Sequence, residues 1–136
     1  NGNFLVGWGG VPLISEHKPG GRLLYDAEFQ GIKSFYRAYR QSWSGIPKSG
    51  ITMLAERVDP ETTRLWISWN GDSRVRNWRI AAGNSKKSLT NVVTRDREGF
   101  ETAINVPSSA TYFKVTGLDA NGRKIGSSSV KQANGS

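Results

Sequence analysis

The sequence predicts an all-β protein in two parts, a short antiparallel sheet followed by a β-sandwich, and three observations support this. Glycine and proline supply 16 and 5 of the 136 residues, which is typical of a chain with many turns. Hydrophobic residues make up 36% and aromatic residues 10%, which is too apolar for a disordered chain. Beyond residue 50, short runs alternate between apolar and polar residues, and this period of two indicates strands.

The first part, residues 1–45, contains three apolar runs that predict strands: 4–8, 11–15 and 23–29. Pro19-Gly20-Gly21 separates the second run from the third, and proline followed by glycine favours a tight turn, so these two runs predict a hairpin. Residues 32–39 fit two structures. Their aromatic residues have helical spacing, yet aromatic content favours a strand, and we expect a strand.

A small sheet of this kind is only marginally stable alone in water. We therefore expect the chain to form one compact unit, in which the apolar residues of the first part are buried against the sandwich or against a second copy of the chain. The residues concerned are Phe4, Leu5, Val6, Trp8, Leu23, Tyr25, Phe35 and Tyr39.

Residues 41–50 are rich in serine, glycine and proline, which predicts a boundary between parts 1–45 and 46–136. Seven apolar-alternating runs follow: 51–58, 63–69, 76–82, 89–94, 100–106, 112–118 and 124–130. Seven strands with turn signals every ~8–12 residues are typical of an immunoglobulin-like sandwich. The strongest hairpin signal is Asn121-Gly122. Alternation places these residues inward: Leu65, Ile67, Trp69, Trp78, Ile80, Ala82, Phe100, Thr102, Ile104, Phe113 and Val115.

Several classes of site and protein are excluded by composition. The chain has no cysteine, so it has no disulfide, thiolate metal site or cysteine nucleophile, and its one histidine, His17, removes His-pair metal sites. We predict no metal and no cofactor. The longest uncharged run, residues 1–15, is shorter than the ~20 residues of a membrane-spanning helix. The chain begins at Asn1, from which we expect processing or trimming.

Short motifs along nearly the whole chain resemble the late part of the arylsulfotransferase-like proteins of fungi and actinobacteria. In order, they are Gly7-Trp8-Gly9-Gly10-Val11-Pro12, Ser15-Glu16, Leu24-Tyr25-Asp26-Ala27-Glu28-Phe29, Tyr36-Arg37-Ala38-Tyr39-Arg40, Trp43-Ser44-Gly45-Ile46-Pro47, Ser68-Trp69-Asn70-Gly71, Trp78-Arg79, Gly99-Phe100-Glu101-Thr102 and Leu118-Asp119-Ala120-Asn121-Gly122. The resemblance implies that residues 1–45 are a propeller-blade-like segment and that the following sandwich is similar to a fibronectin type III domain.

The resemblance also implies a family activity, sulfate transfer between phenols through a histidine nucleophile inside a β-propeller. The blades that hold the family's catalytic residues are not in this sequence. Its one histidine lies in a His17-Lys18-Pro19-Gly20 turn, and at this turn tip we expect a structural surface side chain. We therefore predict that this chain is not an enzyme.

The basic residues give the candidate site. The formal charge is +8, of which residues 46–136 carry +6. If Trp78, Ile80, Phe113 and Val115 point inward on neighbouring strands, the residues between them point outward together. The predicted anion-binding or partner-binding residues are Arg79, Tyr112, Lys114, Asn77 and, nearby, Arg76. Cations interleaved with an aromatic ring suit an anionic polymer, an acidic membrane surface or a cell-surface glycan, although a merely solvated face has the same pattern.

Three functions remain open at this point. The first is a non-catalytic, extracellular, β-rich binding module, such as a cytotoxic or antifungal defence protein, related to the tail of an arylsulfotransferase-like precursor. The second is an incomplete fragment of an active arylsulfotransferase, inert until the rest of the propeller is supplied; for the chain as a whole, the expected partner of residues 1–45 is the parent propeller or a second copy in a homodimer. The third is a basic domain that binds polyanions or nucleic acid through its charge.

Overall fold

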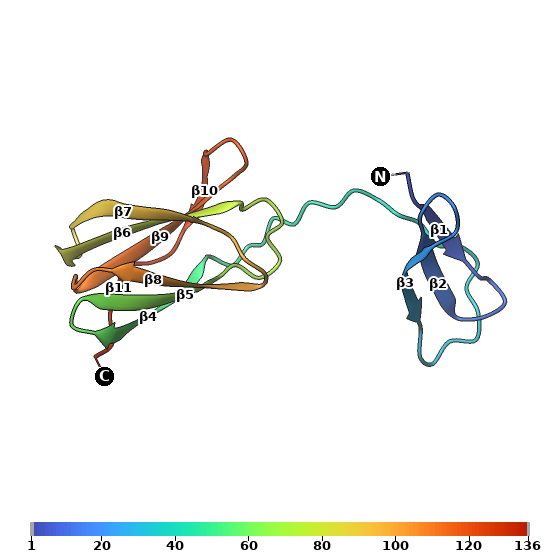
Figure 1. Ribbon diagram of the computed structural model, residues 1–136, viewed down its shortest axis with the longest axis horizontal. Helices are drawn as coiled ribbons and strands as arrows, with labels where there is room; N and C mark the ends of the chain where they lie inside the picture. The colour runs from blue at the N-terminus through green and yellow to red at the C-terminus, as the bar shows by residue number, and fades with distance from the viewer. Residues whose placement is uncertain (1, 136) are drawn as a thin grey trace. The chain divides into compact units, whose positions relative to one another are not determined.

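The computed structural model describes residues 2–135 as an all-β protein with three antiparallel sheets and, within this range, no helix (Figure 1). The chain divides into two compact units, Asn1–Trp43 and Ser44–Ser136, which we call the N-terminal and C-terminal units. The predicted boundary, after residue 45, lies two residues from this division. The chain therefore forms two compact units where one was expected.

The N-terminal unit is a three-stranded sheet in the order β1-β2-β3, formed by β1 (Phe4–Gly7), β2 (Leu13–His17) and β3 (Leu23–Glu28). The predicted hairpin between the second and third strands is confirmed. Its turn is closed by the Lys18 N–H, which donates to the Arg22 carbonyl over 2.9 Å. Gly20 and Gly21 adopt φ values of 93° and 87°, a conformation that side chains with a Cβ rarely adopt.

Residues 29–43 form neither a helix nor a strand, so both structures considered for residues 32–39 are wrong. Here tertiary packing overrides local preference. Phe35 stacks edge-to-face on Phe29, with ring centroids 5.8 Å apart. A Cβ built on Gly7 would lie 3.1 Å from both Phe35 and Ala38, so this segment covers β1 closely. The remaining aromatic residues point outward, and Tyr36 is 88% exposed.

Within the N-terminal unit itself, the apolar residues expected to be buried are covered only in part, and their burial against the sandwich or against a second copy of the chain stays a prediction. Leu5, Val6 and Phe35 are half-buried. The other five are exposed in the single chain, Phe4 by 62%: Phe4, Trp8, Leu23, Tyr25 and Tyr39. A single sheet with one covering segment has too few partners to bury both of its faces.

The C-terminal unit has two sheets that lie face to face as a sandwich (Figure 1). The first sheet has the order β4-β5-β8 and contains β4 (Thr52–Asp59), β5 (Thr62–Ser68) and β8 (Glu101–Pro107). The second has the order β10-β9-β6-β7 and contains β6 (Asn77–Ser85), β7 (Ser88–Asp96), β9 (Tyr112–Leu118) and β10 (Lys124–Ser127). A short strand, β11 (Lys131–Gln132), also pairs with β9.

The last predicted strand, 124–130, ends early: β10 stops at Ser127, residues 128–130 are not in a strand, and β11 follows beyond the predicted range. The Ser128 hydroxyl accepts the Val115 N–H over 3.0 Å, and the Ser128 N–H donates to the Val115 carbonyl over 2.8 Å. Ser128 thus provides hydrogen-bond partners for both the N–H and the carbonyl of Val115 where the regular pairing with β9 is interrupted. The hairpin predicted at Asn121-Gly122 is confirmed, with Gly122 at a φ of 73°.

Inward-facing residues of both sheets form one core. Ten of the eleven residues predicted to point inward are buried: Leu65, Ile67, Trp69, Trp78, Ile80, Ala82, Thr102, Ile104, Phe113 and Val115. Phe100 is the exception, because it precedes β8 next to Gly99, which has a positive φ, and the alternation of β8 does not extend to it. It is 68% exposed. Within the core, the buried Trp78 indole N–H donates to Thr102 Oγ1 over 3.0 Å.

Candidate anion-binding face

The outer face of the second sheet carries the predicted cations. Strands β6 and β9 pair antiparallel, as expected, with Arg79 opposite Thr116, Ala81 opposite Lys114, and Gly83 opposite Tyr112. The residues between them point into the core. Arg79, Lys114 and Tyr112 therefore lie on the same outer surface, and each is half-buried.

The spacing within this group is wider than that of directly opposite residues on paired strands. Arg79 and Lys114 are diagonal in the ladder, a relationship that typically separates side chains by ~7–8 Å. The residues directly opposite Arg79 are neutral, Thr94 on β7 and Thr116 on β9. Diagonal placement lowers the repulsion between the two cations and leaves room for one anionic group to contact both.

A further cation, outside the predicted set, belongs to this surface. Lys86 Nζ lies 5.4 Å from the centroid of the Tyr112 ring, within the range of a cation–π contact. Lys86 is in the β6–β7 turn, so strand alternation could not identify it. Among the described residues, no ion pair involves Arg79, Lys86 or Lys114. We call Arg79, Lys86, Tyr112 and Lys114 the basic face.

The structure does not bring the other two predicted residues into this group. Asn77 shares the outer surface, but its side-chain amide donates to Asp96 Oδ1 over 2.6 Å, so an acid occupies that end of the sheet. The Arg76 guanidinium donates to the Ser73 and Val75 carbonyls over 3.0 and 3.2 Å and is held by the loop before β6.

His17 lies in a different environment from the predicted turn tip. It is the last residue of β2, half-buried, and its Nδ1–H donates to the Gly21 carbonyl over 3.1 Å. Its Nε2 lies 2.8 Å from the Ser15 hydroxyl, which also accepts the Trp8 indole N–H over 2.8 Å. The sequence carried a signal for this contact, since residues 15 and 17 share a strand face. Both ring nitrogens are occupied by the unit's own groups.

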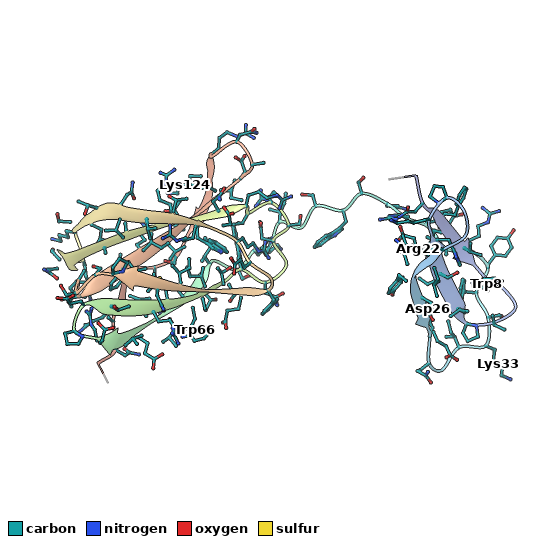
Figure 2. All side chains as sticks on the ribbon, viewed as in Figure 1. Trp8, Arg22, Asp26, Lys33, Trp66 and Lys124 are labelled. Carbon is teal, nitrogen blue, oxygen red and sulfur yellow. The ribbon has the colours of Figure 1, made fainter. Side chains whose placement is uncertain are left out.

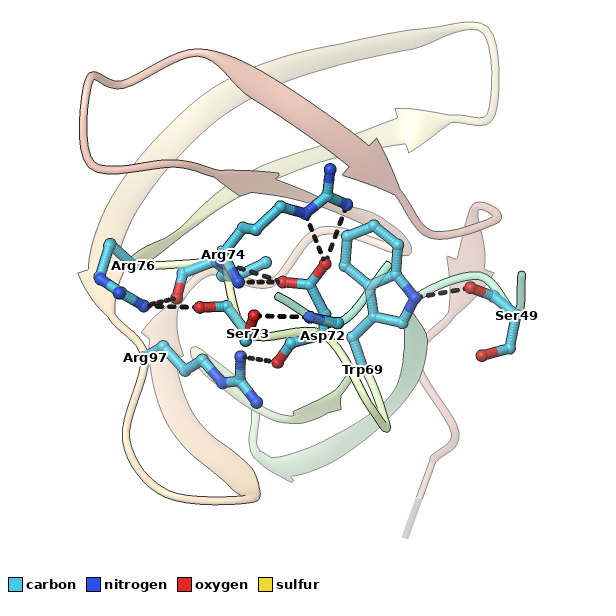
Figure 3. Close-up of polar contacts among 9 residues, drawn as sticks. Ser49, Trp69, Asp72, Ser73, Arg74, Arg76 and Arg97 are labelled. Carbon is cyan, nitrogen blue, oxygen red and sulfur yellow. Dashed lines mark hydrogen bonds and ion pairs between the residues drawn. The ribbon is translucent and has the colours of Figure 1, made fainter. Parts of the chain in front are cut away.

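The most buried charged group belongs to the loop before β6 (Figure 3). Asp72 accepts the N–H groups of Arg74 and Val75, each over 2.8 Å, and the Arg74 guanidinium over 3.0 Å. Burial would raise the pKa of Asp72, but the hydrogen bonds from Val75 and Arg74 outweigh it and lower the pKa. Every partner of the carboxylate is part of the loop, so this cluster is structural.

Residues 2–135 contain no group of three or more histidine, cysteine or acidic side chains placed to hold a metal ion. None of the described segments is a helix with the length and apolarity needed to cross a membrane. A scan against protein-family models gives no match, and searches of curated proteins and of solved structures give none either.

Proposed function

We propose that this protein is a non-catalytic, extracellular binding module that recognises anionic polymers through the basic face of its C-terminal unit. The observation that carries the proposal is the β6–β9 register, which places Arg79 and Lys114 diagonally on one outer surface, with neutral residues directly opposite both. We also propose that this unit is an immunoglobulin- or fibronectin III-like sandwich. Its seven main strands are divided between two sheets, β4-β5-β8 and β10-β9-β6-β7, as in such sandwiches, and β11 is an addition beside β9.

The chemistry of the basic face suits sulfate or phosphate groups. A guanidinium can donate two parallel hydrogen bonds to such an oxyanion, and an ammonium adds a compact charge beside it. The Tyr112 ring offers a surface for stacking, with Lys86 over it. Repulsion between neighbouring cations is relieved when an anion binds, and the excess of bases over acids in residues 46–136 extends the attraction beyond the contact itself.

The experiment is binding of the full chain to heparin and to acidic liposomes at increasing salt concentration. We expect Arg79→Ala with Lys114→Ala to weaken binding and to reduce the slope of log K against log salt by about 1 for each lost contact. The control is Lys48→Ala with Lys124→Ala, which removes the same charge from exposed positions outside the basic face. Equal losses in the two double variants would show that net charge alone, and not this face, governs binding.

The resemblance to arylsulfotransferase-like proteins leaves a catalytic alternative, whose nucleophile would be His17. Against it, the Nδ1–H is held by Gly21 and Nε2 by Ser15, so the lone pair that would attack sulfur is not free. We expect no sulfate transfer from p-nitrophenyl sulfate to phenol. Turnover above buffer that is lost in His17→Ala would contradict the proposed non-catalytic role.

A further inference from the structure

The outer face of the other sheet, β4-β5-β8, has a different composition, and three neighbouring rows across its strands centre on Trp66. The register gives the rows as Thr52–Ser68–Glu101, Leu54–Trp66–Ala103 and Glu56–Arg64–Asn105. The middle row contains one large aromatic side chain between an exposed leucine and an alanine. Each flanking row consists entirely of hydrogen-bonding side chains.

Trp66 is at the centre of this arrangement, on the central strand of its sheet (Figure 2). On one side along the strand, Arg64 lies over the indole with its guanidinium carbon 5.8 Å from the ring centroid, and its Nε–H donates to Asn105 Oδ1 over 2.8 Å. On the other side is an open hollow of about 330 Å³, lined by Thr52, Leu54, Trp66, Ser68 and Glu101. The hollow therefore combines an indole surface with two hydroxyls and a carboxylate.

The charge around Trp66 distinguishes this face from the basic face. The three rows contain Glu56, Glu101 and Arg64, a net charge of −1. Asp59 adds a further acid at the end of β4, and the acid that lines the hollow is Glu101. A polyanion is repelled there, so the ligand is not the one proposed for the other sheet. An apolar surface beside convergent polar groups is the usual composition of a small-molecule site, and the volume is at the lower end of the range for such sites.

We propose that the hollow beside Trp66 binds a neutral saccharide as a pyranose ring stacked on the indole. A pyranose has an apolar face of C–H groups and a rim of hydroxyls, which matches an aromatic surface bordered by hydroxyl and carboxylate groups. Glu101 accepts hydrogen bonds from two sugar hydroxyls, and Thr52 and Ser68 donate or accept at the same edge. A trimethylammonium group is less well matched, because the hollow presents one aromatic ring rather than a cage.

The experiment is titration of the ¹⁵N-labelled full chain with cellopentaose, chitopentaose and laminaripentaose, followed by NMR. We expect at least one of them to shift the Trp66 indole N–H and the amides of Ser68 and Glu101, with weak affinity, of about millimolar Kd, since the hollow is shallow. Trp66→Ala should reduce affinity at least about tenfold, and Glu101→Gln should reduce it less. Trp66→Tyr should restore part of it.

Trp43→Ala is the control, because it removes an exposed indole that does not line the hollow and should leave the affinity unchanged. A spectrum of Trp66→Ala with the wild-type dispersion of core resonances shows that the variant is folded, as expected for an outward-facing residue. The proposal is overturned if none of the three oligosaccharides shifts these signals, if Trp66→Ala binds as tightly as the wild type, or if choline shifts the same signals and the saccharides do not.

Discussion

The two units of this chain use the same alternation of apolar and polar residues but bury them to very different extents. Every buried hydrophobic residue of the described chain lies between Ile51 and Leu118, in the C-terminal unit. In the described part of the N-terminal unit, the one buried residue is Ser15. The difference shows that strand patterning specifies which residues share a face, whereas burial requires a second layer to cover that face.

The largest expected effect on stability comes from comparing the removal of one phenylalanine side chain from each unit. Phe113→Ala removes a fully buried ring from the shared core, and we expect a loss of about 3–5 kcal/mol in the free energy of unfolding. Phe4→Ala removes a ring that is mostly exposed, and we expect a change below about 0.5 kcal/mol. Denaturant titration followed by NMR separates the signals of the two units. A loss above about 2 kcal/mol in Phe4→Ala would show that the N-terminal face is covered in solution.

The comparison also explains how far the sequence could predict the structure. Strands with a strict period of two and clear turn residues were predicted nearly to their ends. The pairing of β6 with β9 was expected from a fibronectin-like topology, and the register confirms it. Residues 29–43 could not be predicted, since their aromatic residues pack on β1 in an irregular path that neither period describes. Phe100 was assigned inward because alternation does not show where a strand begins.

The candidate sites show the same limit at the level of side chains. Alternation placed Arg79, Tyr112 and Lys114 on one surface, but it could not reveal that Arg76 turns to loop carbonyls or that Lys86 reaches the Tyr112 ring from a turn. The three rows around Trp66 depend on the register of β4, β5 and β8, which the separate strand patterns do not contain.

A second test concerns the charged cluster that belongs to the C-terminal unit. Asp72→Ala leaves the N–H groups of Arg74 and Val75 and the Arg74 guanidinium without their acceptor, and we expect a loss of about 2–3 kcal/mol at pH 7. Arg123→Ala is the control, because its ion pair with Asp119 involves a mostly exposed arginine and should cost less than about 1 kcal/mol. Similar losses of unfolding free energy in both variants would contradict the expectation that the buried Asp72 carboxylate stabilises the fold more than an exposed ion pair does.

The Asp72 carboxylate also makes the free energy of unfolding depend on pH. Because the pKa of Asp72 is lowered in the folded protein, its stabilisation is complete above the unfolded pKa of about 3.9 and is lost as pH falls through the folded value. We expect the difference in stability between the wild type and Asp72→Asn to be constant from pH 7 to about pH 5 and to narrow below about pH 4. A difference that widens in acid would mean that the folded pKa is raised.

A third, smaller effect tests packing at the edge of the sandwich. A Cβ on Gly126 would lie 2.6 Å from the Trp69 ring, so Gly126→Ala must displace a buried indole, and we expect a loss of about 1–2 kcal/mol. Gly50→Ala is the control, because it is the same substitution at a position where the added Cβ would meet no atom within 4 Å. We expect that variant to be neutral or slightly stabilising, by up to about 0.5 kcal/mol. If both variants lose the same stability, backbone freedom and not contact with Trp69 is responsible.

The smallest effect is expected in the N-terminal unit, at its one buried side chain. Ser15→Ala removes the acceptor of the Trp8 indole N–H and the partner of His17 Nε2, and we expect a loss of about 1 kcal/mol, confined to the signals of β1–β3. Hydrogen exchange of the Trp8 indole should become faster, because its hydrogen bond is lost. Ser34→Ala, at an exposed position of the same unit, should leave that exchange rate unchanged. If Ser15→Ala also leaves the exchange rate unchanged, the Ser15 hydroxyl does not protect the Trp8 indole N–H, and the expected loss is contradicted.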